Sequence, residues 1–359
     1  MRYGVIGTGA TGGYYGAKLA QTGKEVHFLF HRDYNYVKEH GLQVDSCDGS
    51  FHLKDVNAYQ STQEMPKCDV VLVGLKSVNN HLLPELLPSL LKEDTLVVLI
   101  QNGIGIEEDV QKMFPGVQLA AGLAFICSAK TEPGRVNHQC YGYINIGNYS
   151  CKQQEKIDEV VDDFRKAGVN ANEVEYLEAR WKKAVWNMPF NGMTVALNTQ
   201  TDILLQNPST LQLIKDQMME VIEAAQACGV KNIDETFAEK MIYNTVHMTP
   251  YSPSMKLDFE FKRPMETYYL YTRPIEEAKK VYDLQRDNLP QAIELLREAM
   301  RLREVDAIGD YWDELRLYLP YSLVDEDYIE KVGVIFRSAS VFEGLDGTNY
   351  EGGWIWGDN

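Results

Sequence analysis

The chain has 359 residues, which is more than one domain usually holds and predicts two domains. A hydrophobic content of 45% is sufficient for a packed core. The net charge of −17 argues against nucleic acid and anionic lipid as partners. No apolar stretch approaches the roughly 20 residues of a membrane span, and no leader-like segment opens the sequence, so we expect a cytoplasmic protein.

A glycine-rich turn lies between the first predicted strand and the first predicted helix. An apolar run over residues 3–6 precedes it, and an amphipathic segment over 14–20 follows. The first glycine permits the turn, the second lets the backbone approach a pyrophosphate, and the third lets helix and strand pack closely. The helix N-terminus offers N–H groups and a positive dipole end to phosphates. This pattern predicts a dinucleotide site formed by Gly7, Thr8, Gly9, Ala10, Thr11 and Gly12.

The second predicted strand, residues 25–30, runs into His31 and Arg32. In a site that prefers NAD, an acidic residue commonly stands here and accepts from the ribose hydroxyls. An arginine can instead pair with a 2′-phosphate, which an acid would repel. We interpret Arg32 as a sign of NADP(H). The alternative is an ordinary exposed arginine at a strand end.

Strand and helix patterns continue to alternate along the first half. A helix and short strands are predicted over 33–68, a buried strand over 69–75, a proline-containing helix over 79–91 and a strand over 95–100. Ligands in a doubly wound sheet lie at the carboxyl ends of strands, which is where Lys76 and Asn102 fall. Further strands are predicted over 117–128 and 135–147, around a Pro133-Gly134 turn, and a helix over 152–167.

From about residue 176 the pattern is largely helical. In a predicted helix over 178–195, Lys183, Asn187 and Asn191 are spaced i, i+4, i+8 and therefore share one face. Pro189 is expected to bend this helix. Polar groups on a face with apolar neighbours need partners, and a polar substrate would supply them. The alternative is a solvated polar stripe.

These patterns predict an α/β fold with an N-terminal Rossmann-like dinucleotide-binding domain and a mostly α-helical C-terminal domain. We place the first domain at 1–175, a helical substrate and catalytic domain at 176–305, and an acidic, aromatic extension of undetermined role at 306–359. The six cysteines lack metal-site spacing, so we expect free thiols and no metal.

Several motifs, in order, resemble the ketopantoate reductase (2-dehydropantoate 2-reductase) family over roughly residues 1–300. They are the glycine turn, Arg32, Gly74-Leu75-Lys76, Gln101-Asn102-Gly103-Ile104-Gly105, Trp181-Lys182-Lys183 with Asn187 and Asn191, Ser254-Met255-Lys256-Leu257-Asp258, Arg263-Pro264-Met265-Glu266 and Arg273-Pro274-Ile275-Glu276-Glu277-Ala278. The stretch 249–253 departs from the family pattern, and the extension continues where the family normally ends.

The resemblance implies reduction of 2-dehydropantoate to (R)-pantoate with NADPH, a step of pantothenate and coenzyme A biosynthesis. It implies that Lys183 binds substrate and donates the proton. It further implies that Asn187, Asn191 and Ser254 hold the substrate, that Asn102 contacts substrate and cofactor, and that Lys76 and Glu266 position the cofactor.

Elementary chemistry agrees with a lysine in this role. Hydride delivery to a ketone builds an alkoxide, which needs a positioned proton donor and positive charge. A partly desolvated lysine provides both, because desolvation lowers its pKa toward the working pH. Lys182 is the rival candidate, but on a helix it points about 100° away from the face of the two asparagines.

Two other functions remain open. The chain can be a related D-2-hydroxyacid dehydrogenase that acts on another 2-keto acid, since the stretch 249–253 alters the predicted pocket. It can also be a non-catalytic NADP(H) sensor, although a sensor has no use for a proton donor. We expect a small-molecule substrate and neither nucleic acid nor membrane as partner, and we leave a homodimer open.

Overall fold

The computed structural model describes residues 1–248, 250 and 252–281. The chain divides into two compact units, Met1–Ala179 and a second that begins at Arg180. The predicted extension over 306–359 lies outside the described residues, and so do Thr249 and Tyr251 of the stretch that departs from the family pattern.

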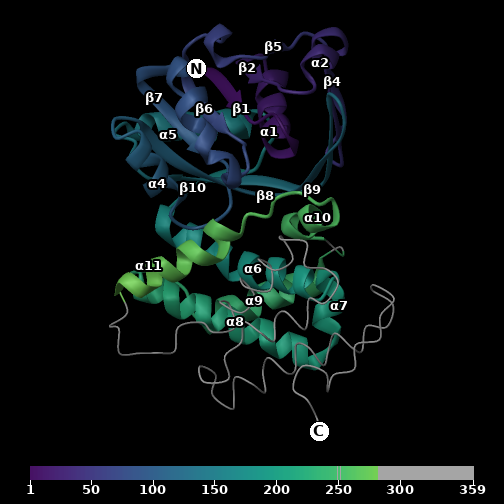
Figure 1. The fold of residues 1–359 in the computed structure, drawn as a ribbon, viewed down its shortest axis with the longest axis vertical. Helices are drawn as coiled ribbons and strands as arrows, with labels where there is room; N and C mark the ends of the chain where they lie inside the picture. Colours follow the sequence, from purple (N-terminus) through teal and green to yellow (C-terminus); the bar gives the residue numbers. More distant parts are fainter. Residues whose placement is uncertain (249, 251, 282–359) are drawn as a thin grey trace. The chain divides into compact units, whose positions relative to one another are not determined.

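The first unit is built on one ten-stranded sheet (Figure 1). The strand order is β4-β3-β9-β8-β7-β6-β1-β2-β5, and β10 pairs with β9. Neighbouring strands are parallel except in the pairs β8–β9 and β3–β4. The strands are β1 (Arg2–Ile6), β2 (Glu25–Leu29), β3 (Leu42–Ser46), β4 (Phe51–Leu53), β5 (Asn57–Tyr59), β6 (Cys68–Val73), β7 (Leu91–Leu99), β8 (Gln118–Glu132), β9 (Arg135–Asn148) and β10 (Ala171–Val174).

Burial explains why the central strands read as continuous apolar runs. Val70, Val71, Leu72 and Val73 of β6 are all fully buried, as expected for a parallel strand covered on both faces. In the turn of the long hairpin between β8 and β9, Gly134 has a φ of +65°. Glycine adopts this left-handed conformation without a steric penalty, because it has no Cβ. The strands that we predicted in this unit are therefore present, with β10 as an additional short one.

The helices of the first unit are mostly short. They are α1 (Ala10–Gln21), α2 (Tyr34–His40), α3 (Leu83–Leu86), α4 (Ile106–Met113) and α5 (Gln154–Lys166), with 3₁₀ turns η1 (Thr62–Glu64), η2 (Ser77–Leu82) and η3 (Pro88–Leu90). The single helix predicted over 79–91 is wrong: η2, α3 and η3 replace it, and β7 already begins at Leu91. Pro84 and Pro88 lack the N–H groups that a continuous helix needs, and each lies in the first turn of a new short segment instead.

The second unit is helical (Figure 1). Its elements are α6 (Tyr176–Ala196), which includes the boundary at Arg180, α7 (Thr201–Gln206), α8 (Pro208–Ala227), α9 (Glu235–His247), α10 (Ser254–Glu260), the π-helical η4 (Tyr268–Thr272) and α11 (Arg273–Val281). Every residue of α6 from Ala184 to Ala196 is buried, which makes it the central helix of this unit. Pro189 lies inside α6 without ending it. Among the helices of the described residues, none has the length and apolar character needed to cross a bilayer.

Candidate active site

The glycine turn after β1 needs glycine at its first and third positions. Gly7 has a φ of +85°, and a Cβ there would lie 2.4 Å from the backbone nitrogen of Leu75. A Cβ on Gly12 would lie 2.3 Å from the carbonyl oxygen of Gly7. Both contacts are with backbone, which cannot move aside as a flexible side chain can. Close packing of β1, α1 and the end of β6 therefore excludes any side chain at these two glycines.

The middle glycine differs, because it has room around it. A Cβ on Gly9 would meet no atom within 4 Å. The requirement for glycine at this position is thus not set by packing within the protein, which fits a backbone that a cofactor approaches. The Thr8 hydroxyl donates to the carbonyl of Leu29 (2.8 Å) and ties the turn to the end of β2. Ala10 and Thr11, both partly buried, begin α1.

Strand pairing brings the other predicted cofactor residues to one edge of the sheet. β2, β1, β6 and β7 are neighbours and parallel, so their carboxyl ends share an edge. Arg32 follows β2, Lys76 follows β6 and Asn102 follows β7. Arg32 is exposed, while Lys76 and Asn102 are partly buried. The glycine turn follows β1 at the same edge.

Two buried amides that we did not predict as site residues join the loops at this edge. Gln101 donates from Nε2 to the carbonyl of Leu75 (2.8 Å) and to Oδ1 of Asn80 (2.7 Å). The loop after β7 is thereby fastened to the loop after β6, which carries Lys76. An amide at a strand's carboxyl end is a recognisable signal for Gln101. Asn80, in the 3₁₀ turn η2, gives no such signal.

In the second unit, the two asparagines of α6 are buried as predicted for one inward face. Asn187 and Asn191 are 7% and 3% exposed. Asn191 donates from Nδ2 to the carbonyl of Asn187 (2.8 Å), and its Oδ1 accepts the N–H of Met255 (3.2 Å). Asn191 therefore fastens the start of α10 to α6 and brings Ser254, the residue before Met255, toward this face.

Lys183 lies in an environment that favours its neutral form. Burial lowers the pKa of Lys183 to about 7, the charge of Arg180 lowers this pKa further, and the charge of Glu266 raises it. Arg180 is 2% exposed and Glu266 is 7% exposed, so these charges act where water screens them little. Our sequence reasoning missed Arg180, although a basic residue one helical turn before Lys183 is a visible signal. Lys183 at this pKa can both hold and release a proton near neutral pH.

Lys182, the rival proton donor, points elsewhere. Its Nζ lies 5.5 Å from the centroid of the Phe237 ring on α9. Lys183, by contrast, has the charges of Arg180 and Glu266 nearby. The two adjacent lysines thus have different surroundings, as the turn of about 100° per helical residue requires.

Two family models of known proteins match this chain, one over most of the sheet-containing first unit and one over the helical second unit. The family model described as "Ketopantoate reductase PanE/ApbA" matches residues 3–150, and "Ketopantoate reductase PanE/ApbA C terminal" matches residues 175–282. The chain belongs to the ketopantoate reductase family. Membership confirms the predicted fold class, a Rossmann-like dinucleotide-binding domain followed by a helical domain, and makes the chain a member of a family of oxidoreductases acting on CH–OH groups.

Individual members of the ketopantoate reductase family align with most of this chain. A 2-dehydropantoate 2-reductase from Nostoc sp. is 43% identical over 296 residues, 81% of this chain and 91% of that protein. The crystal structure of the enzyme of that name from Geobacter metallireducens has a TM-score of 0.80 at 35% identity, covering 86% of this chain and 100% of the other. The one from Methylococcus capsulatus has a TM-score of 0.78 at 33% identity, covering 87% and 99%.

Proposed function

We propose that this chain reduces 2-dehydropantoate to (R)-pantoate with NADPH, a step of pantothenate and coenzyme A biosynthesis. The observation that carries this proposal is Lys183, whose pKa is lowered to about 7 on the helix that also holds Asn187 and Asn191. The names of the relatives support the choice of substrate. Lys183 then gives its proton to the developing alkoxide, and the charge of the ammonium stabilises that alkoxide before transfer.

The remaining predicted residues divide between the two units. Reduced nicotinamide, when bound, supplies the hydride. The glycine turn holds the pyrophosphate, Arg32 the 2′-phosphate, and Lys76 and Asn102 lie at the same sheet edge to position the rest. In the second unit, Asn187 and Ser254 bind the keto acid, and Asn191 positions Ser254 through Met255. We also predicted Glu266 as a cofactor residue. Its negative charge raises the pKa of Lys183 and so limits the lowering that burial causes.

The test is NADPH oxidation by the purified chain across a panel of 2-keto acids that includes 2-dehydropantoate. We expect the highest kcat/KM with 2-dehydropantoate. A higher kcat/KM with another keto acid would identify a related 2-hydroxyacid dehydrogenase. Turnover with none of them, together with intact NADPH binding, would favour the sensor.

We predict that kcat/KM for the keto acid falls as the pH rises through about 7. The proton donor must be protonated, and Lys183 loses its proton around this pH because burial and Arg180 lower its pKa. Above that range activity should decrease about tenfold per pH unit. The measurement is a pH profile at saturating NADPH. Lys183→Arg keeps the positive charge at all these pH values, so its weaker activity should lack this limb. A flat wild-type profile up to pH 9 would contradict the assignment.

We predict that Arg32→Ala weakens NADPH selectively. A charge-assisted contact to a phosphate contributes roughly 1.5–3 kcal/mol, which corresponds to about ten- to hundredfold in affinity. NADH lacks the 2′-phosphate, so its kcat/KM should change little. The measurement compares kcat/KM for both cofactors in wild type and variant. An unchanged ratio would show that the 2′-phosphate is bound by other residues.

A further inference from the structure

Three side chains that can bind metal lie together in the first unit, where β3 ends beside β9. Cys47 and Asp48 follow β3, and His138 is part of β9. β3 and β9 are parallel, with Ser46 opposite His138 in register. The N–H of Cys47 donates to the carbonyl of His138 (3.0 Å), so backbone pairing holds the loop after β3 against the histidine. Cys47 and His138 are about 90 residues apart in the sequence, so sequence spacing did not indicate that they are neighbours.

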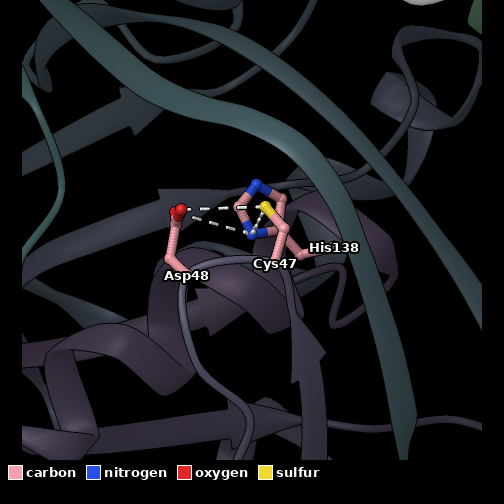
Figure 2. Close-up of side chains that lie close together, drawn as sticks. All are labelled: Cys47, Asp48 and His138. Carbon is pink, nitrogen blue, oxygen red and sulfur yellow. Dashed lines mark hydrogen bonds and ion pairs between the residues drawn. The ribbon is translucent and has the colours of Figure 1, made fainter.

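One donor atom from each of the three side chains lies within 4.8 Å of the other two (Figure 2). The Cys47 Sγ lies 3.7 Å from an oxygen of Asp48 and 3.8 Å from Nδ1 of His138. The other Asp48 oxygen lies 4.0 Å from the same Nδ1. In a tetrahedral site with metal–ligand bonds of 2.0–2.3 Å, neighbouring ligand atoms are about 3.3–3.8 Å apart. Small side-chain movements therefore bring one donor atom of each residue to a corner of such a tetrahedron.

The histidine is prepared to act as a ligand through Nδ1. The Ser46 hydroxyl accepts the N–H of Asp48 (3.1 Å) and lies 2.9 Å from Nδ1, so its proton is placed to donate to that nitrogen. Nδ1 has a single lone pair, so an ion that binds this nitrogen replaces the Ser46 hydrogen bond. The ring of Tyr14 on α1, 4.4 Å away between centroids, fixes the imidazole orientation.

A nucleophilic cysteine is the competing interpretation, and the contacts oppose it. In such a group the histidine uses one ring nitrogen for the nucleophile and the other for the orienting carboxylate. Here Cys47 and Asp48 both face Nδ1. A metal ion bound here would take Cys47 as a thiolate, and the thiol proton would pass into solvent.

We propose that Cys47, Asp48 and His138 form a binding site for a divalent transition-metal ion of the Zn²⁺ class. A thiolate, an imidazole and a carboxylate suit Zn²⁺ and not Mg²⁺ or Ca²⁺, which take oxygen ligands. Cys47 and Asp48 are exposed, so the ion enters from solvent and water completes the fourth position. The ion joins the β3–β4 loop to β9 beside α1, the helix that begins at the glycine turn.

The experiment titrates Co²⁺ as a spectroscopic probe into chelator-treated full-length protein without an affinity tag. We expect one Co²⁺ per chain, with a thiolate-to-cobalt charge-transfer band and the visible bands of tetrahedral Co²⁺, and loss of both when Zn²⁺ is added. Cys47→Ser should abolish the charge-transfer band. Asp48→Asn should weaken Co²⁺ binding by roughly tenfold or more. Both positions are exposed, so these variants should fold.

Two other cysteines serve as matched controls. Cys228→Ser, which changes a partly buried thiol after α8, should leave every band unchanged. Cys140→Ser tests a rival thiol, because Cys140 lies on β9 two residues after His138. The proposal is wrong if no charge-transfer band forms with excess Co²⁺. It is also wrong if the band survives Cys47→Ser, or if Cys140→Ser removes it.

Discussion

Replacing Lys183 with alanine is expected to lower kcat by about 100- to 10,000-fold while NADPH binding stays nearly intact. A positioned general acid contributes a factor of this size, and loss of the positive charge beside the alkoxide adds to it. The expectation rests on the pKa of Lys183, which burial and Arg180 bring down to about 7. The measurement is steady-state kinetics with 2-dehydropantoate, together with NADPH binding followed by fluorescence.

Lys182→Ala is the matched control for this variant. It removes an identical side chain one residue earlier on α6, where the ammonium lies over the Phe237 ring. A cation–π contact of this kind contributes about 0.5–1 kcal/mol, so stability should change slightly and kcat little. Inactivity of Lys182→Ala beside an active Lys183→Ala would show that the assignment by helix face is wrong.

Substituting the first two glycines of the turn should separate folding from cofactor binding. Gly7→Ala is expected to reduce the free energy of unfolding by about 2–5 kcal/mol, because alanine resists the positive φ and its Cβ overlaps the Leu75 backbone. Gly9→Ala should fold with nearly wild-type stability, since no atom lies within 4 Å of its Cβ. The same Cβ would project where the pyrophosphate is proposed to lie.

The measurement for this pair is the urea unfolding midpoint without ligand, beside the Kd for NADPH. For Gly9→Ala we expect affinity to fall by about ten- to hundredfold, equivalent to losing one or two charge-assisted hydrogen bonds. If Gly9→Ala binds NADPH as tightly as wild type, the pyrophosphate is not held at this turn. A Gly7→Ala variant of unchanged stability would mean that β6 can move away from the turn.

Local sequence patterns determined much of the architecture. The apolar run of β6, the glycine spacing before α1 and the lysine–asparagine spacing on α6 each depend on neighbours within a few residues, which a periodicity captures. The helix predicted over 79–91 is wrong because hydrophobic spacing alone does not decide whether a helix continues. Its hydrophobic spacing is compatible with a helix, but Pro84 and Pro88 divide it into short turns.

Tertiary structure alone decided the features that depend on contacts between distant residues. The lowered pKa of Lys183 requires burial and the nearby charges of Arg180 and Glu266, and Glu266 comes from more than 80 residues away. Asn80 becomes important only because Gln101 reaches it from the next strand's loop. Cys47, Asp48 and His138 showed no metal spacing in the sequence. The parallel register of β3 with β9 brings them together, since strand pairing sets which distant residues become neighbours.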